Sequence, residues 1–220
     1  MSAGISRLII LVKIVLICRQ WYHRVYDYMP TYKFPASEIS TLLPHQSHLI
    51  NRLLVNRGFT DEASAAAFLA PNYDTQLHDP ALLHDSQKAV ARIKQALVAQ
   101  ENIIIFSDYD CDGIPGAVIL HDLFKAVGYE NFSNYIPHRH YEGFGLSIAA
   151  VEKLSAQDAK LIITIDCGTN DVGAVKRANE LGIDVIITDH HEPEVELPEA
   201  IAVVNPKLGA YPFSELCGAE

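Results

Sequence analysis

The sequence is poor in cysteine, and none of its four cysteines forms a C-x-x-C pair. A disulfide framework and a thiolate zinc site are therefore not expected, and a reducing cytoplasm is the predicted location. Cys111 and Cys167 each adjoin an Asp discussed below. We interpret both as small buried side chains in tight turns, with thiolate ligation of a metal as the alternative.

Basic residues are also scarce, since 17 Lys and Arg face 27 Asp and Glu and give a formal net charge of −10. This balance argues against a broad basic surface for duplex nucleic acid, although it leaves room for a local basic groove. We expect some of the excess carboxylates to be metal ligands.

No apolar run is long enough for a standard membrane span. The longest, "LIILVKIVLIC" (8–18), falls short of the ~20 residues that cross a bilayer, and Lys13 interrupts it. No small-residue cleavage site of a signal peptide follows. Met29 opens "MPTYKFPASE", which resembles an ordinary cytosolic start. We interpret residues 1–28 as an extension or a misassigned start, with a membrane anchor as the alternative.

The remaining chain predicts an α/β protein preceded by a small helical segment, 29–100. Within 42–70 we expect two short helices, the first with an apolar face of Leu49, Leu53 and Leu54, and the second capped by Thr60. Another helix is expected from Asp85. From 101 to 220, apolar strands alternate with helices, which predicts a parallel sheet with helices on both faces. The predicted strands are "NIIIFS", "NFSNYIP", "KLIITID", "DVIITD" and "AIAVVN".

Acidic and imidazole side chains follow three of these strands, where ligands bind in open parallel sheets. They are Asp108, Asp110 and Asp112 after the first strand, Asp166 after the third, and Asp189, His190 and His191 after the fourth. Carboxylates with one imidazole suit Mn²⁺ or Mg²⁺, and this number of ligands suits a two-ion site that promotes phosphoryl transfer.

The acidic residues have two other interpretations. "DYDCDG" matches the opening of an EF-hand loop, but Ile119 stands where that loop needs a Glu, and a strand rather than a helix precedes it. Alternatively, Asp166 and Asp189 only cap the helices that follow them.

The segment "IPHRHYEGFGLS" (136–147) follows the second strand onto the same edge. Arg139 can form a two-pronged contact with a phosphate, and Gly143 and Gly145 permit close approach of a ligand to the backbone. A polar loop with turn glycines is the alternative.

The motifs "DYDCDG", "RHYEGFGLS", "TIDCGTND" and "ITDHHEP" resemble, in order and spacing, those of the DHH phosphoesterase superfamily. The resemblance covers about residues 42–220 and is closest to the RecJ branch of single-strand-specific exonucleases. It implies metal ligands at Asp110, Asp112, Asp166 and His190, with Asp108 and Asp189 completing the cluster. It also implies a catalytic centre of Asp110, Asp112 and His191, in which His191 and Arg139 contact phosphates.

This resemblance implies an Mn²⁺- or Mg²⁺-dependent hydrolase that degrades single-stranded DNA from the 5′ end in recombination and repair. A single-strand-binding protein or a helicase is then an expected partner, and association with a membrane is not expected. The family continues for several hundred residues, so we expect 101–220 to be a truncated DHH domain with little activity alone. His138 departs from the Asn common in the family, and "GTND" from the frequent "GISS". The alternatives are a phosphodiesterase for oligoribonucleotides or cyclic dinucleotides, and a non-catalytic scaffold.

Overall fold

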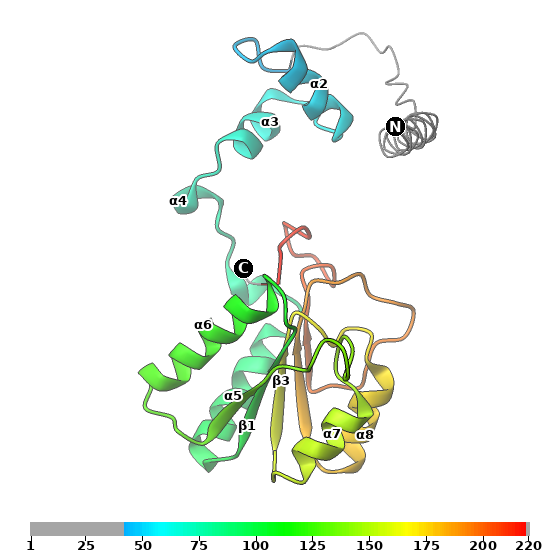
Figure 1. The fold of residues 1–220 in the computed structure, drawn as a ribbon. Coiled ribbons are helices and arrows are strands. Elements are labelled where there is room, and N and C mark those ends of the chain that lie inside the picture. The colour runs from blue at the N-terminus through cyan, green and yellow to red at the C-terminus, as the bar shows by residue number, and fades with distance from the viewer. Residues whose placement is uncertain (1–41, 219–220) are drawn as a thin grey trace, which may run out of the picture. The chain divides into compact units, whose positions relative to one another are not determined.

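The computed structural model describes residues 42–218, which divide into two compact units between Asn72 and Tyr73 (Figure 1). The predicted extension at 1–28 lies outside the described residues. Within 42–218, no helix has the length and apolar character that crossing a bilayer requires.

The first unit contains two short helices, α2 (His48–Asn56) and α3 (Glu62–Leu69). Both begin at a capping side chain, because Ser47 accepts a hydrogen bond from the N–H of Ile50, and Asp61 from the N–H of Ser64. The predicted cap at Thr60 is therefore one residue too early. The small core of this unit consists of Leu42, Leu43, Leu54 and Ala65.

The apolar face predicted for α2 is only partly correct. Leu54 is buried, whereas Leu49 and Leu53 are exposed. Asn51 is buried in their place, and its side chain exchanges hydrogen bonds with the backbone N–H and C=O of Leu43 at 2.8 and 3.0 Å. A satisfied polar side chain thus fixes the preceding turn against α2, which apolar periodicity alone does not show.

The second unit is built on a five-stranded parallel sheet with strand order β2-β1-β3-β4-β5. The predicted fold class is confirmed, and all five predicted strands are present. Their bounds are β1 (Ile103–Ser107), β2 (Phe132–Tyr135), β3 (Leu161–Ile165), β4 (Asp184–Thr188) and β5 (Ala202–Val204).

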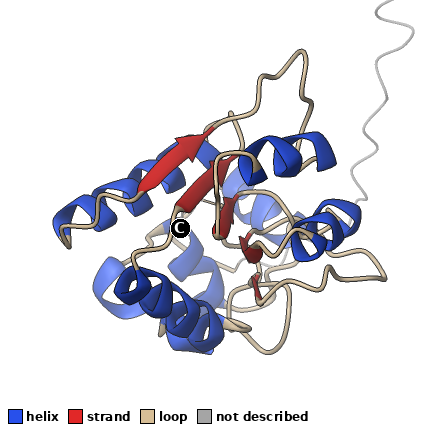
Figure 2. Ribbon diagram, turned by 90° about the horizontal axis from the view of Figure 1, so that it is seen from below, coloured by secondary structure: helices blue, strands red, loops and turns tan. Residues whose placement is uncertain are grey.

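Helices cover both faces of this sheet (Figure 2). Ile103 and Ile105 of β1 pack with α5 (Ser86–Ala99) and α6 (Gly113–Ala126). Ile104 and Phe106 point to the other face and pack with α7 (Ile148–Ser155) and α8 (Val172–Glu180). Burial on both faces explains why these strands are continuously apolar rather than alternating.

Helix α5 belongs to the sheet unit, although the sequence placed it in the helical segment that ends at residue 100. Its Ala89 and Ala96 pack in the core beside β1. Its Arg92 forms ion pairs with Glu101 (Nη2–Oε2, 2.6 Å) and Asp184 (Nε–Oδ2, 2.5 Å). The boundary therefore lies earlier than predicted. A one-turn helix α4 (Tyr73–Gln76) and a 3₁₀ turn (Pro80–Leu82) precede α5.

The strand order positions the candidate site. From β1 the chain passes through α6 to β2 on one side, and then through α7 to β3 on the other side of β1. The carboxyl ends of β1 and β3 therefore flank the point where the strand order reverses. In open α/β sheets this is where ligands bind.

Candidate metal centre at the carboxyl edge of the sheet

Three aspartates continue the backbone ladder one residue beyond their strands. Asp108 donates its N–H to the C=O of Ile165 (3.1 Å), and Asp166 donates to Thr188 (2.9 Å). Asp189 does the same beyond β4, where its N–H donates to Val204 (3.0 Å). The side chains of all three therefore leave the same edge of the sheet from fixed backbone positions.

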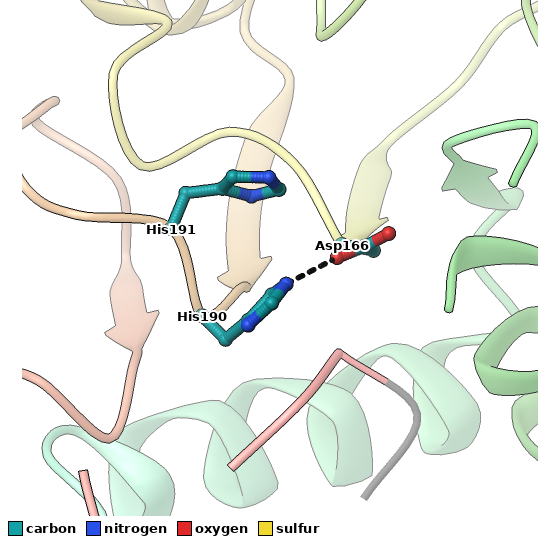
Figure 3. Close-up of side chains that lie close together, drawn as sticks. All are labelled: Asp166, His190 and His191. Atoms are coloured by element: carbon teal, nitrogen blue, oxygen red, sulfur yellow. Dashed lines mark ion pairs between the residues drawn. The ribbon is translucent and has the colours of Figure 1, made fainter. Parts of the chain in front are cut away.

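The predicted residues gather in two clusters that share Asp166. One consists of Asp108, Asp110 and Asp166, and the other of Asp166, His190 and His191; the possible ligand atoms of each lie within 4.8 Å of one another. Figure 3 shows the second cluster, in which His190 Nε2 lies 3.1 Å from Asp166 Oδ1.

Two oxygens of this site accept no hydrogen bond from the described residues, although His190 Nε2 lies at ion-pair distance, 3.1 Å, from one of them. They are Asp108 Oδ1 and Asp166 Oδ1, in side chains that are only 2% and 1% exposed. Buried carboxylate oxygens without donors are costly unless a cation compensates them. Carboxylates with one or two imidazoles are the ligands that Mn²⁺ and Mg²⁺ take, so the side chains fit a hard divalent ion.

Asp166 also has a shifted pKa. Its backbone φ of 61° lies in the left-handed region, which Asp adopts more readily than most residues. Burial, followed by the adjacent Asp110, raises the pKa of Asp166 to about 7. Burial also raises the pKa of Asp108. Both carboxyl groups thus resist ionisation until positive charge reaches them.

Asp110 has a second role, at the start of α6. Its Oδ1 accepts hydrogen bonds from the N–H groups of Asp112 (2.9 Å) and Gly113 (3.1 Å). The N–H of Gly113, followed by that of Asp112, lowers the pKa of Asp110. Gly113 itself is required, because a Cβ there would overlap the carbonyl oxygen of Asp108. The capping role considered for Asp166 and Asp189 thus falls to Asp110.

Asp189 holds a histidine and lies in neither cluster. Its Oδ1 lies 2.7 Å from His191 Nδ1 and accepts the backbone N–H of His190 and of His191, while Oδ2 accepts the N–H of Thr169. Burial opposes ionisation of Asp189, but these donors outweigh it and lower its pKa. These contacts make Asp189 a positioning residue for His191, and its role as a metal ligand stays a prediction.

The ring of His191 is oriented by that contact. An ionised Asp189 can only accept, so Nδ1 of His191 is its donor and Nε2 is free to face a ligand. Burial lowers the pKa of His191, but the Asp189 carboxylate outweighs it and raises the pKa overall. Asp112 lies at the margin of the site, with Oδ2 3.8 Å from His190 Nε2.

The segment 136–147 lies partly as expected. The Arg139 side chain is exposed, and its Cζ is 4.5 Å from the centre of the Tyr109 ring, next to Asp108. Gly143 has φ 82°, and a Cβ at this position would meet no atom within 4 Å. Gly145, however, faces the Asp171 carboxylate, where a Cβ would lie 2.7 Å from Oδ2, so its open face receives a side chain and not a ligand.

Two close contacts of this edge were not predicted. A Cβ on Gly218 would overlap Asp166 Oδ1 and Cβ, so the segment after β5 approaches the shared carboxylate as only glycine permits. The ring of Phe144 meets the ring of His191 edge to face, with centroids 5.4 Å apart. Sequence signals existed for both, namely the glycine in "LCGA" and the aromatic between two glycines in "GFG".

Comparison with known proteins identifies the DHH family over most of the unit that contains the sheet. The model of the DHH family, N-terminal domain, matches residues 102–220. Single-stranded-DNA-specific exonuclease RecJ of Bacillus subtilis (strain 168) is 45% identical over 177 residues, which are 79% of this chain and 22% of that protein. RecJ of Escherichia coli (strain K12) is 36% identical over 134 residues, 60% of this chain and 23% of that protein.

Solved structures agree. A crystal structure of exonuclease RecJ bound to manganese superposes with a TM-score of 0.60 at 31% identity, over 65% of this chain and 36% of that one. RecJ of Thermus thermophilus in complex with Mn²⁺ gives a TM-score of 0.56 at 27% identity, over 77% of this chain and 23% of that one. The chain therefore spans between about a fifth and a third of the length of these relatives.

Proposed function

Because the chain belongs to the DHH family, we propose that the edge around Asp166 is the metal-dependent phosphodiesterase centre of a RecJ-type exonuclease acting on single-stranded DNA. The observation that carries the proposal is the pair of ligand clusters that share Asp166, with buried carboxylate oxygens lacking donors. Similar proteins named for this activity, two of them with manganese, support it.

We assign the ligands from the geometry. Asp108, Asp110 and Asp166 would hold one Mn²⁺ or Mg²⁺ ion, and Asp166 with His190 would hold a second, with Asp112 beside it. When bound, two such ions supply an activated water and withdraw negative charge from the phosphodiester. The free Oδ2 of Asp110 remains available to an ion, because its capping hydrogen bonds use only Oδ1.

The chain's own side chains bind and orient the substrate. With Nδ1 donating to Asp189, His191 can donate from Nε2 to an oxygen of the scissile phosphate in its protonated form, which the Asp189 carboxylate favours by raising the pKa of His191. Arg139, stacked on Tyr109, provides two parallel donors to a neighbouring phosphate. Removing mononucleotides from the 5′ end, in a cytoplasmic repair process with a single-strand-binding protein or helicase, is the biological role we propose.

The test is hydrolysis of a single-stranded oligonucleotide, labelled at either end, with and without Mn²⁺. We expect slow release of mononucleotides from 5′ to 3′, faster than on duplex or RNA strands of the same sequence. His191→Ala should abolish it. Asp158→Asn is the matched control, because Asp158 is an exposed acid before β3, at the opposite edge of the sheet. Equal rates for wild type and His191→Ala would refute the assignment.

A further inference from the structure

Phe144 is an exposed aromatic residue in direct contact with the candidate site. Its side chain is 56% exposed, and its ring packs edge to face on His191 at an interplanar angle of 72°. A large aromatic ring is usually buried in a core, and one held in water beside a reactive side chain offers a surface to a ligand. We propose that Phe144 is the stacking surface for the nucleobase next to the scissile phosphate. This inference rests on the proposed function.

The ring is held in place although glycines flank it. Before it, Glu142 accepts the backbone N–H of His138 on Oε2 (2.8 Å) and the hydroxyl of Tyr135 on Oε1. After it, the N–H of Leu146 donates to Oδ2 of the half-buried Asp171 (2.7 Å). The segment is thus fixed on both sides of Phe144, so little order has to be gained when a ligand stacks on the ring.

The position of the ring selects a nucleobase as the ligand. The ring touches His191, whose Nε2 faces the phosphate, and a base is joined to its phosphate through one sugar. The exposed face of Phe144 is therefore within reach of that base. Stacking on an aromatic ring accepts every base, because each has a π face, and it favours unpaired bases that can leave their neighbours. Phe144 thus provides single-strand selectivity without sequence selectivity.

The test is a cycle in which either the ring or the base is removed. The cleavage rates of wild type and Phe144→Ala are measured under single-turnover conditions with Mn²⁺. The substrates are a normal strand and strands with a tetrahydrofuran abasic unit at the first, second or third nucleotide from each end. Phe144→Trp keeps the stacking face, whereas Phe144→Leu keeps apolar volume without it. Leu123→Ala is the control, because Leu123 is similarly exposed but lies near the C-terminal end of α6, whereas the site adjoins the N-terminal end of that helix.

We expect Phe144→Ala to lower kcat/KM on the normal strand about tenfold, within the range known for base–aromatic stacking. One abasic position should lower the wild-type value by a similar factor and leave Phe144→Ala almost unaffected. Phe144→Trp should retain the rate and Phe144→Leu should lose it. An equal loss for Phe144→Ala on normal and abasic strands would overturn the proposal, because the ring would then act only through His191. Absence of any wild-type cleavage would instead refute the proposed function and this inference with it.

Discussion

Asp166→Asn is the sharpest perturbation of the metal centre, because Asp166 is shared by both ligand clusters. The substitution preserves shape and the left-handed backbone, which Asn adopts readily. Carboxylate oxygens of Asp108, Asp110 and Asp166 lie within 4.8 Å of one another. Two unit charges at that separation repel by ~3.5 kcal/mol at an effective dielectric constant of about 20.

Without a metal ion, and at pH 8, where Asp166 with its pKa of about 7 is ionised, removing the Asp166 charge should therefore stabilise the protein. Water at the margin of the cluster screens part of the repulsion, so we expect a gain of at least ~1 kcal/mol, or roughly 2–4 °C in the melting temperature. The response to metal should change in the opposite direction. For wild type, Mn²⁺ at 100 times its dissociation constant adds about 2.7 kcal/mol, or roughly 5–10 °C, and Asp166→Asn should lose most of this gain.

The assay is thermal unfolding followed by circular dichroism in EDTA and across an Mn²⁺ titration. Asp158→Asn serves as the control because Asp158 also has a left-handed backbone, with φ 59° against 61°, yet is exposed. Its response to Mn²⁺ should match the wild type. If Asp166→Asn unfolds at a lower temperature in EDTA and gains as much from Mn²⁺ as the wild type, the charge-repulsion reasoning and the metal site are both refuted.

Three further changes test other parts of the structure. Gly113→Ala should destabilise the protein by ~1–3 kcal/mol in urea unfolding, because its Cβ would overlap the carbonyl of Asp108; a neutral effect would contradict that contact. Gly218→Ala should reduce the Mn²⁺-induced rise in melting temperature by displacing Asp166, and an undiminished rise would show that the carboxylate adapts. Removing residues 1–28, interpreted from the sequence as an extension or a misassigned start, should leave the unfolding midpoint unchanged; loss of cooperative unfolding would contradict this.

The fold was largely predictable from the sequence because strands buried on both faces must be apolar throughout. "NIIIFS" and "KLIITID" therefore indicated β1 and β3 directly, and the rule for parallel sheets placed Asp108 and Asp166 at one edge. The helices of the first unit were less predictable. In α2 only Leu54 is buried with Asn51, so the apolar pattern of a nine-residue helix contained too few positions to locate its buried face.

The roles of individual oxygens at the site were not predictable, because they depend on backbone groups that the loops bring together. Asp189, for example, orients His191 and accepts the N–H of Thr169, 20 residues away, and neither contact is visible in the motif around it. Gly145 was expected to admit a ligand, but the space beside it holds the carboxylate of Asp171. The same carboxylate accepts the N–H of Leu146, from which it is 25 residues away in the sequence. Such pairings follow from the register of loops at the sheet edge, and local sequence patterns do not encode them.

The same contacts decide between a metal centre and a purely structural set of aspartates. A capping role accounts for Asp110, and a positioning role accounts for Asp189, so neither requires an ion. Asp108 and Asp166 are different: both are buried, and each has an oxygen that accepts no hydrogen bond. These features destabilise the fold unless something else compensates them, and natural sequences retain such conflicts mainly at functional sites. A divalent cation would compensate both residues at once, so the metal assignment depends on this pair.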